Sequence, residues 1–154
     1  MYPKTKHNKG DIMESGDIIQ TEDRNKGDSQ SVARHLPTIE VLRNHGGSGK
    51  DYIRVVVGKN AKHPNESEHH IKWIELYAHT KMLNVVKIGR VNFTPGTEPD
   101  AIFRLVYFGK YREFCAVSYC NVHGLWQSCI EIREELRLTA GCRREKCLQE
   151  GFGV

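Results

Sequence analysis

The sequence predicts an all-β domain, an antiparallel sandwich or barrel of six or seven short strands. From Val32 onward, short runs rich in β-branched and aromatic residues recur, and turn residues such as Gly, Pro and Asn separate them. No amphipathic helix pattern lies between these runs, which argues against alternating α/β architectures. With 154 residues, the chain is long enough for one domain with a buried core.

The expected strands follow one another closely. The first two are predicted to form a hairpin, because the Gly-rich segment 44–49 connects them. A polar loop from Lys59 to Glu68 precedes the third run, and turn residues bound the later ones. The expected strands are Thr38–Leu42, Tyr52–Val57, His70–Tyr77, Asn84–Phe93, Ala101–Phe108, Glu113–Cys120 and Ile130–Arg133.

The two ends of the chain differ from this central region. Residues 1–31 are rich in charged, Gly and Ser residues and poor in apolar ones, so we expect a flexible N-terminal arm. Residues 32–132 form the predicted sandwich domain. Residues 133–154 are expected to be a C-terminal tail that is partly helical or disordered, because only Glu134–Leu138 has a helix-forming composition.

Composition excludes several classes of protein. The formal net charge of +4 is dispersed rather than gathered in a basic stripe, so no nucleic-acid partner is expected. No apolar run approaches the roughly 18 residues of a membrane span, and the polar start lacks a secretory signal. The five cysteines, all after Tyr111, predict reduced thiols or metal ligands rather than a disulfide framework, and a cytoplasmic location.

Cys120 and His123 are the first candidate metal ligands. They lie three residues apart where an apolar run gives way to a turn at Gly124, and zinc ligands often use this spacing. Cys142 and Cys147 are weaker candidates, because two thiols without a second pair are poor grounds for a zinc site.

Further imidazoles lie at junctions between loops and expected strands. His35, His63 and the pair His69–His70 all occupy such junctions, which cluster at the ends of a sandwich. In an extended chain His69 and His70 point to opposite faces, so only one of them can be a ligand, and spacing alone does not select it.

The donor types restrict the metal. A thiolate with several imidazoles excludes magnesium and calcium, which prefer oxygen, and leaves zinc, copper or iron. Four imidazoles and one thiolate exceed the tetrahedral set of a structural zinc and leave one octahedral position open, which favours iron. A blue-copper electron-transfer site with Gln127 as the weak axial ligand, or a purely structural metal site, remains an alternative.

Three separated motifs resemble the iron-binding core of the superoxide reductases, also called neelaredoxins and desulfoferrodoxins. The motifs are His35–Glu40, His63–Tyr77 and Ser118–Trp126, and the resemblance spans roughly Val32 to Ser128. It implies an immunoglobulin-like sandwich of seven strands and an iron ion bound by four equatorial histidines and one axial cysteine. On this chain, it implies as ligands His35, His63, His69 and His123, with Cys120 axial.

The same resemblance implies a function. The expected activity is the one-electron reduction of superoxide to hydrogen peroxide at a mononuclear non-haem iron. The absence of cysteine before Cys115 implies a form with one iron (Fe) per chain. The expected partners are superoxide, a rubredoxin-like electron donor and further copies of the chain in a dimer or tetramer.

Two positions depart from the family pattern. Family members commonly carry Glu-Lys directly before the first ligand histidine, whereas this chain has Ala33 and Arg34. Ala33 has no donor atom for the sixth iron position. Arg34 keeps a positive charge that can attract superoxide, but it is a poor general acid, so Lys59 and Lys62 are considered as substitutes. Glu40 and backbone groups are considered as hydrogen-bond partners of the ligands.

Overall fold

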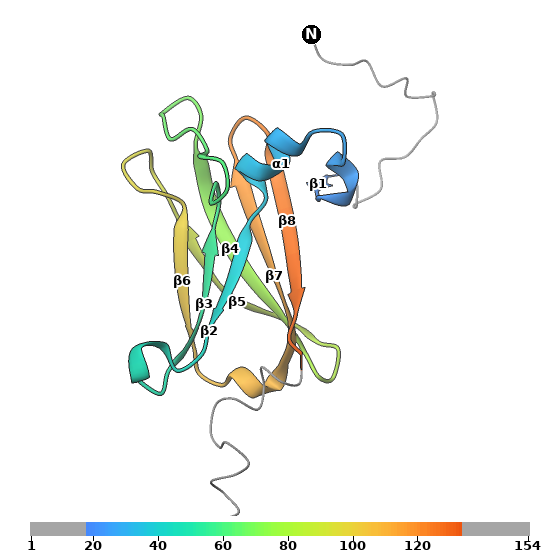
Figure 1. The fold of residues 1–154 in the computed structure, drawn as a ribbon, viewed down its shortest axis with the longest axis vertical. Coiled ribbons are helices and arrows are strands. Elements are labelled where there is room, and N and C mark those ends of the chain that lie inside the picture. The colour runs from blue at the N-terminus through green and yellow to red at the C-terminus, as the bar shows by residue number, and fades with distance from the viewer. Residues whose placement is uncertain (1–17, 134–154) are drawn as a thin grey trace, which may run out of the picture.

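The structure is a computed structural model that describes residues 18–133 of the chain (Figure 1). The predictions made for residues 1–17 and for the tail 134–154, including Cys142 and Cys147, lie outside these residues. None of the helices in the described part of the chain is long and apolar enough to cross a membrane.

Two β-sheets pack face to face, which confirms the predicted all-β sandwich. The larger sheet has the strand order β1-β8-β7-β4-β5 and the smaller has the order β2-β3-β6. Neighbouring strands are antiparallel except for β1 and β8. The elements are β1 (Ile19–Gln20), η2 (Asp23–Asn25), α1 (Ser29–His35), β2 (Thr38–Leu42), η3 (His45–Gly47), β3 (Asp51–Val56), β4 (Ile71–Thr80), β5 (Val85–Asn92), β6 (Asp100–Leu105), η4 (Phe108–Lys110), β7 (Tyr111–Cys120) and β8 (Gly124–Glu131).

Alternate residues of the strands fill the space between the sheets. Ile53 and Val55 of β3 face Ile74 and Leu76 of β4, and all four side chains are fully buried. Strand β7 shows the same alternation, and its inward row ends at Cys120, which has no exposed surface. The pleat of β7 therefore delivers one thiol into the end of the core.

The last strand starts earlier than expected. β8 begins at Gly124 and pairs directly back on β7, with Cys120 opposite Gly124, whereas the sequence indicated a strand only from Ile130. Gly124 has a φ of +79°, a conformation that closes the tight turn and that other residues rarely adopt. The polar turn and Gly124 interrupt the apolar pattern, so the sequence did not predict a strand that starts at this position.

Residues 18–31 lie within the segment that the sequence indicated as a flexible arm, and in the structure they form regular elements. β1 pairs in parallel with β8 through Ile19 and Leu125. Helix α1 was not predicted; the side chain of Asp28 caps it by accepting a hydrogen bond from the Ser31 amide at 2.9 Å. A seven-residue helix carries too short a pattern to be detected by periodicity.

The prediction of reduced thiols is wrong for two cysteines, because Cys115 and Cys129 form a disulfide. They lie directly opposite each other on β7 and β8, with Cα atoms 4.1 Å apart. This pairing depends on the register of a hairpin that the sequence did not reveal. Cys120 is the free cysteine of the described region.

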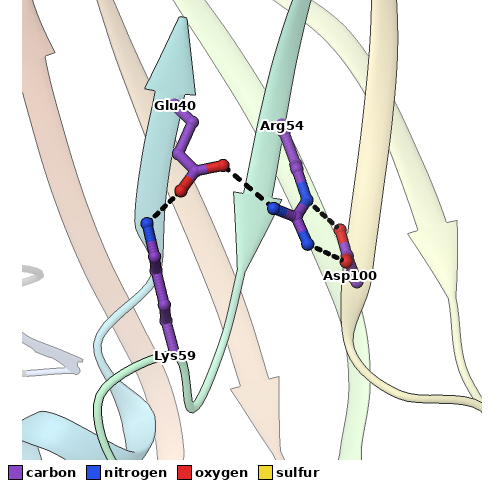
Figure 2. Close-up of polar contacts among 4 residues, drawn as sticks. All are labelled: Glu40, Arg54, Lys59 and Asp100. Carbon is purple, nitrogen blue, oxygen red and sulfur yellow. Dashed lines mark hydrogen bonds and ion pairs between the residues drawn. The ribbon is translucent and has the colours of Figure 1, made fainter.

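An ion-pair network ties the smaller sheet to the loop that follows β3 (Figure 2). Arg54 of β3 donates to Asp100 of β6 and, at 3.1 Å, to Glu40 of β2. Lys59 also pairs with Glu40 and lowers the pKa of this carboxyl group. Glu40 on β2 and Lys59 at the start of the loop therefore pair with each other. Glu40 does not act as a partner of the predicted ligands, and Lys59 does not replace Arg34 as a proton donor.

Candidate metal centre

His35, the last residue of α1, is held rigidly from two sides. Its Nδ1 donates to the carbonyl oxygen of Ser31, one helical turn earlier, at 2.8 Å. The indole of Trp126 stacks on the imidazole with ring centroids 4.9 Å apart and planes 16° apart. Because the proton is on Nδ1, Nε2 carries the lone pair, so His35 presents a metal-binding nitrogen to the end of the sandwich.

His63 is similarly fixed by the loop between β3 and β4. Its Nδ1 donates to the carbonyl oxygen of Pro64 at 2.5 Å. Gly58, at φ +79°, allows the loop to close on itself, since a Cβ atom there would lie only 2.7 Å from the His63 backbone nitrogen. The His63 Nε2 is buried and has no hydrogen-bond partner within the described residues. Such an orphaned nitrogen costs about 1–3 kcal/mol unless something binds it.

The adjacent residues His69 and His70 point in different directions. His69 reaches the imidazole cluster, whereas His70 is buried and donates from Nδ1 to the Glu66 carbonyl oxygen at 2.9 Å. The backbone of His70 is tied to Asn121, whose side chain accepts its amide and whose amide donates to its carbonyl. The Asn121 amide is thus directed to His70 rather than to the sulfur of Cys120, and this tie joins the β3–β4 loop to the β7–β8 turn.

The β7–β8 turn supplies the two remaining donors. His123 Nδ1 lies 3.6 Å from Cys120 Sγ, 3.0 Å from His35 Nε2 and 3.1 Å from His69 Nε2. The ligand atoms of His35, His69, Cys120 and His123 all lie within 4.8 Å of one another. The His63 ring contacts the rings of His35 and His69, with centroid distances of 4.7 and 4.8 Å.

These distances fit a metal ion. Two nitrogen ligands at right angles around a metal, each about 2.1 Å from it, are about 3 Å apart, as the nitrogen pairs at His123 are. At most one proton on His123 Nδ1 could satisfy these contacts without a metal. Three segments distant in the sequence therefore bring four imidazoles and one thiol together, and the predicted ligand set meets at one place. The donor set suits a borderline metal such as iron.

The environment favours the neutral form of three of the imidazoles. Burial lowers the pKa of His35, His63 and His69, and that of His63 falls to about 4. Repulsion among the clustered rings lowers these pKa values further. Neutral imidazole is the form that binds metals, so the site is prepared for a cation at neutral pH.

One side of the cluster opens to solvent through a pocket of about 200 Å³. Arg34 is exposed on its rim, and His69 and His123 line it. Ala33 lines a different pocket, beside Leu36 and Asn60. Neither Lys59 nor Lys62 borders the opening, and Lys62 faces Glu98 at 4.0 Å. Arg34 is therefore the cation at the entrance within the described residues.

The structure also places Gln127, the predicted axial ligand of a blue-copper site, away from the candidate metal centre. Gln127 follows the inward-facing Trp126 on β8, so its side chain points to the outer face of the larger sheet, where its amide donates to Cys129 Sγ at 3.5 Å. Gln127 cannot be an axial ligand beside Cys120, and the prediction that assigned it this role is wrong.

The sequence patterns did not identify the groups that orient the predicted ligands. The Ser31 and Pro64 carbonyl groups and the Trp126 ring act through backbone or stacking contacts, which no spacing rule identifies. The contact with the Ser31 carbonyl group could be expected only if the helix were already known, because any residue four positions before His35 would supply that carbonyl.

Known proteins resemble this chain in sequence and in structure. The family model described as Desulfoferrodoxin matches residues 26–129. A protein named superoxide reductase from Pyrococcus horikoshii is 43% identical over 104 residues, covering 64% of this chain and 87% of that protein. A putative superoxide reductase from Thermotoga maritima is 33% identical over 141 residues, covering 80% and 99%.

Two solved structures share the fold. The superoxide reductase (neelaredoxin) from Ignicoccus hospitalis superposes with a TM-score of 0.64 at 40% identity, covering 79% of this chain and 98% of that one. The reduced neelaredoxin from Archaeoglobus fulgidus gives 0.62 at 35% identity, covering 75% and 98%. On the strength of the family match and these relatives, the chain belongs to the desulfoferrodoxin family.

Proposed function

We propose that this protein is a superoxide reductase that converts superoxide to hydrogen peroxide at a single iron ion. The observation that carries the proposal is the convergence of four imidazoles and one buried thiol below an open pocket. The relatives that bear the name superoxide reductase support the same reaction. The proposed ligand atoms are Nε2 of His35, His63 and His69, Nδ1 of His123 and Sγ of Cys120.

Iron held by these residues would supply one electron to superoxide. The chain positions its ligands before the metal arrives: the Ser31 and Pro64 carbonyl oxygens hold the protons of His35 and His63 on Nδ1. The buried Cys120 sulfur would donate electron density to the bound ion.

Arg34 is the proposed substrate-attracting residue. It is exposed at the rim of the pocket next to His35, where its permanent charge draws the superoxide anion toward the opening. An arginine does not release its proton at physiological pH, so the two protons of hydrogen peroxide come from water that enters the open pocket.

The partners of the protein are part of the proposal. The exposed ring of His123 offers a short covalent route from the surface to the metal, which suits a one-electron carrier of the rubredoxin class. A homo-oligomer, dimer or tetramer, is proposed from the family resemblance. A cytoplasmic location stays a prediction, and the Cys115–Cys129 disulfide does not support it, because disulfides persist mainly in oxidising compartments.

Metal analysis and superoxide kinetics test the proposal together. The purified protein should contain one iron per chain, show a thiolate-to-iron charge-transfer band when oxidised, and lose that band stoichiometrically when reduced. The ferrous protein should then consume superoxide with formation of hydrogen peroxide. Stoichiometric zinc or copper in protein purified without added metal, or a ferrous protein inert to superoxide, would contradict it. His45→Ala, which changes an exposed histidine outside the site, is the matched control.

A further inference from the structure

A second group of metal-binding side chains lies on the outer face of the larger sheet. It consists of His79 on β4, Glu113 and Cys115 on β7, and Cys129 on β8, and we call it the outer-face cluster. The ligand atoms of His79, Glu113 and Cys115 lie within 4.8 Å of one another. His79 contacts the Glu113 carboxylate directly, and Cys129 is joined to Cys115 by the disulfide.

This cluster is separate from the iron site. Cys115 and Cys120 are five residues apart on β7, so their side chains point to opposite faces of the sheet, and their positions differ by roughly 17 Å along the strand. Cys115 is half-buried on the outside, whereas Cys120 is fully buried inside. The proposed reduction of superoxide uses none of the four residues of the outer-face cluster.

The register of three strands creates the cluster. His79 lies opposite Glu113, and Cys115 lies opposite Cys129, on two neighbouring rows of the same face. Directly opposite residues have Cβ atoms about 4.5–5.5 Å apart, so His79 lies near Glu113 and Cys115 near Cys129. Cys115 joins the two pairs, because its sulfur lies within 4.8 Å of the donor atoms of His79 and Glu113 and is bonded to the sulfur of Cys129. The side chains of His79 and Glu113 are 30% and 24% exposed, so a metal bound here would be partly dehydrated yet reachable from solvent.

The donor types match one chemical class of metal. Two thiolates, one imidazole and one carboxylate complete the tetrahedral set that zinc and its close analogues prefer. The amide of Gln127 already donates to Cys129 Sγ at 3.5 Å, and such a contact stabilises a thiolate more than a thiol. His79 Nδ1 faces the Glu113 carboxylate, and a cation could take the position between these two donor atoms.

We propose that the outer-face cluster is a redox-gated site for a zinc-class cation, open only when the disulfide is reduced. A cellular dithiol supplies two electrons and two protons, the S–S bond breaks, and two thiols form while the dithiol becomes a disulfide. The cation then displaces the thiol protons and binds both sulfurs, His79 and Glu113. Hydrogen peroxide then oxidises the two thiolates by two electrons: the S–S bond re-forms, the O–O bond breaks to give two waters after uptake of two protons, and the cation is released.

The test uses the iron-loaded full chain in which Cys142→Ser and Cys147→Ser remove two of the three cysteines outside the cluster, the third being the proposed iron ligand Cys120. Cd²⁺ is the probe, because its thiolate complexes absorb in the ultraviolet. After treatment with a phosphine reductant, the protein should bind one additional Cd²⁺ per chain, with the thiolate band appearing in proportion. The disulfide form should bind less than about a tenth as much. Hydrogen peroxide should release the bound Cd²⁺ and restore the disulfide.

Variants locate the ion. Cys129→Ser should abolish the thiolate-to-cadmium band of a two-sulfur site, and His79→Ala should weaken Cd²⁺ binding about tenfold or more. His45→Ala should have no effect. An unchanged iron charge-transfer band shows throughout that the iron site is intact and that Cd²⁺ has not replaced iron. If the reduced protein binds no extra Cd²⁺, or binds it equally after His79→Ala and Cys129→Ser, the proposal is wrong.

Discussion

Replacing His63 with leucine should stabilise the metal-free protein in acid while weakening iron binding. His63 is 3% exposed, its Nε2 has no partner in the described region, and burial lowers its pKa to about 4 from the ordinary 6.5. Leucine has a similar volume and no polar atom. The substitution therefore separates the cost of an unoccupied ligand from the benefit of a bound metal.

The size of the effect follows from the two pKa values. A group with a lowered pKa in the folded state contributes its full stability above the unfolded value, and this stability is lost as the pH falls. Between pH 7.5 and pH 5 the unfolded chain takes up a proton at His63, whereas the folded chain largely does not. The wild-type protein thereby loses about 2 kcal/mol that the leucine variant retains.

At pH 7.5 the two metal-free proteins should be nearly equally stable. Removal of the orphaned Nε2 gains about 1–3 kcal/mol, and loss of the hydrogen bond from Nδ1 to Pro64 costs about 0.5–1.5 kcal/mol. Imperfect filling of the site by leucine offsets much of the remainder. We therefore expect the difference in stability between His63→Leu and the wild type to grow as the pH falls.

Urea unfolding of chelator-treated protein at pH 7.5 and pH 5 measures this difference. His45→Leu is the control, because His45 is exposed and its replacement should not change the pH dependence. If wild type and His63→Leu lose the same stability between the two pH values, the lowered pKa of His63 is refuted. The iron-loaded proteins should rank in the opposite order, with the variant losing iron to a chelator at least about tenfold faster.

Substitutions at four further positions test other parts of the site. Cys120→Ser should abolish both the charge-transfer band in the visible spectrum and the reaction with superoxide, since it removes the proposed sulfur ligand. Arg34→Gln should slow superoxide capture by up to about tenfold and flatten its dependence on ionic strength in pulse radiolysis, whereas Arg34→Lys should retain most of the rate. Ala33→Glu should leave the ferric spectrum unchanged at all pH values, because Ala33 lines the pocket beside Leu36 rather than the open side of the metal site. Gly58→Ala should cost about 1–3 kcal/mol in thermal unfolding and lower the iron content, because its Cβ would collide with the backbone of His63.

The strands were predictable where their burial pattern is strong. Thr38–Leu42 matches β2 as predicted, and the expected strand over Glu113–Cys120 lies within β7. The sequence predicted these segments because they are rich in β-branched and aromatic residues and have turn residues at both ends. Helix α1 and strand β1 depend instead on one capping contact and on pairing with β8, which become visible only once the chain is folded.

The donor types at the metal site were predictable from the sequence, and the choice of ligands came from the family resemblance. Residue chemistry did not decide whether His69 or His70 is the ligand. An extended chain directs their side chains to opposite faces, but it does not show which face carries the metal site. The bridge between Glu66 and His69 sets the turn that directs His69 to the cluster and His70 into the interior. Such a choice depends on backbone hydrogen bonds of the loop, which residue types alone do not encode.

The candidate metal site joins three parts of the fold: helix α1, the β3–β4 loop and the β7–β8 turn. Helix α1 has seven residues, fewer than an isolated helix needs, and its last residue, His35, anchors it to β8 by stacking on Trp126. The β3–β4 loop and the β7–β8 turn are joined by Asn121 and carry the other ligands. A bound ion therefore links three segments at one end of the sandwich (Figure 1). Because the two sheets have their own apolar core, loss of the ion should loosen α1 and β1 first and leave the sandwich folded.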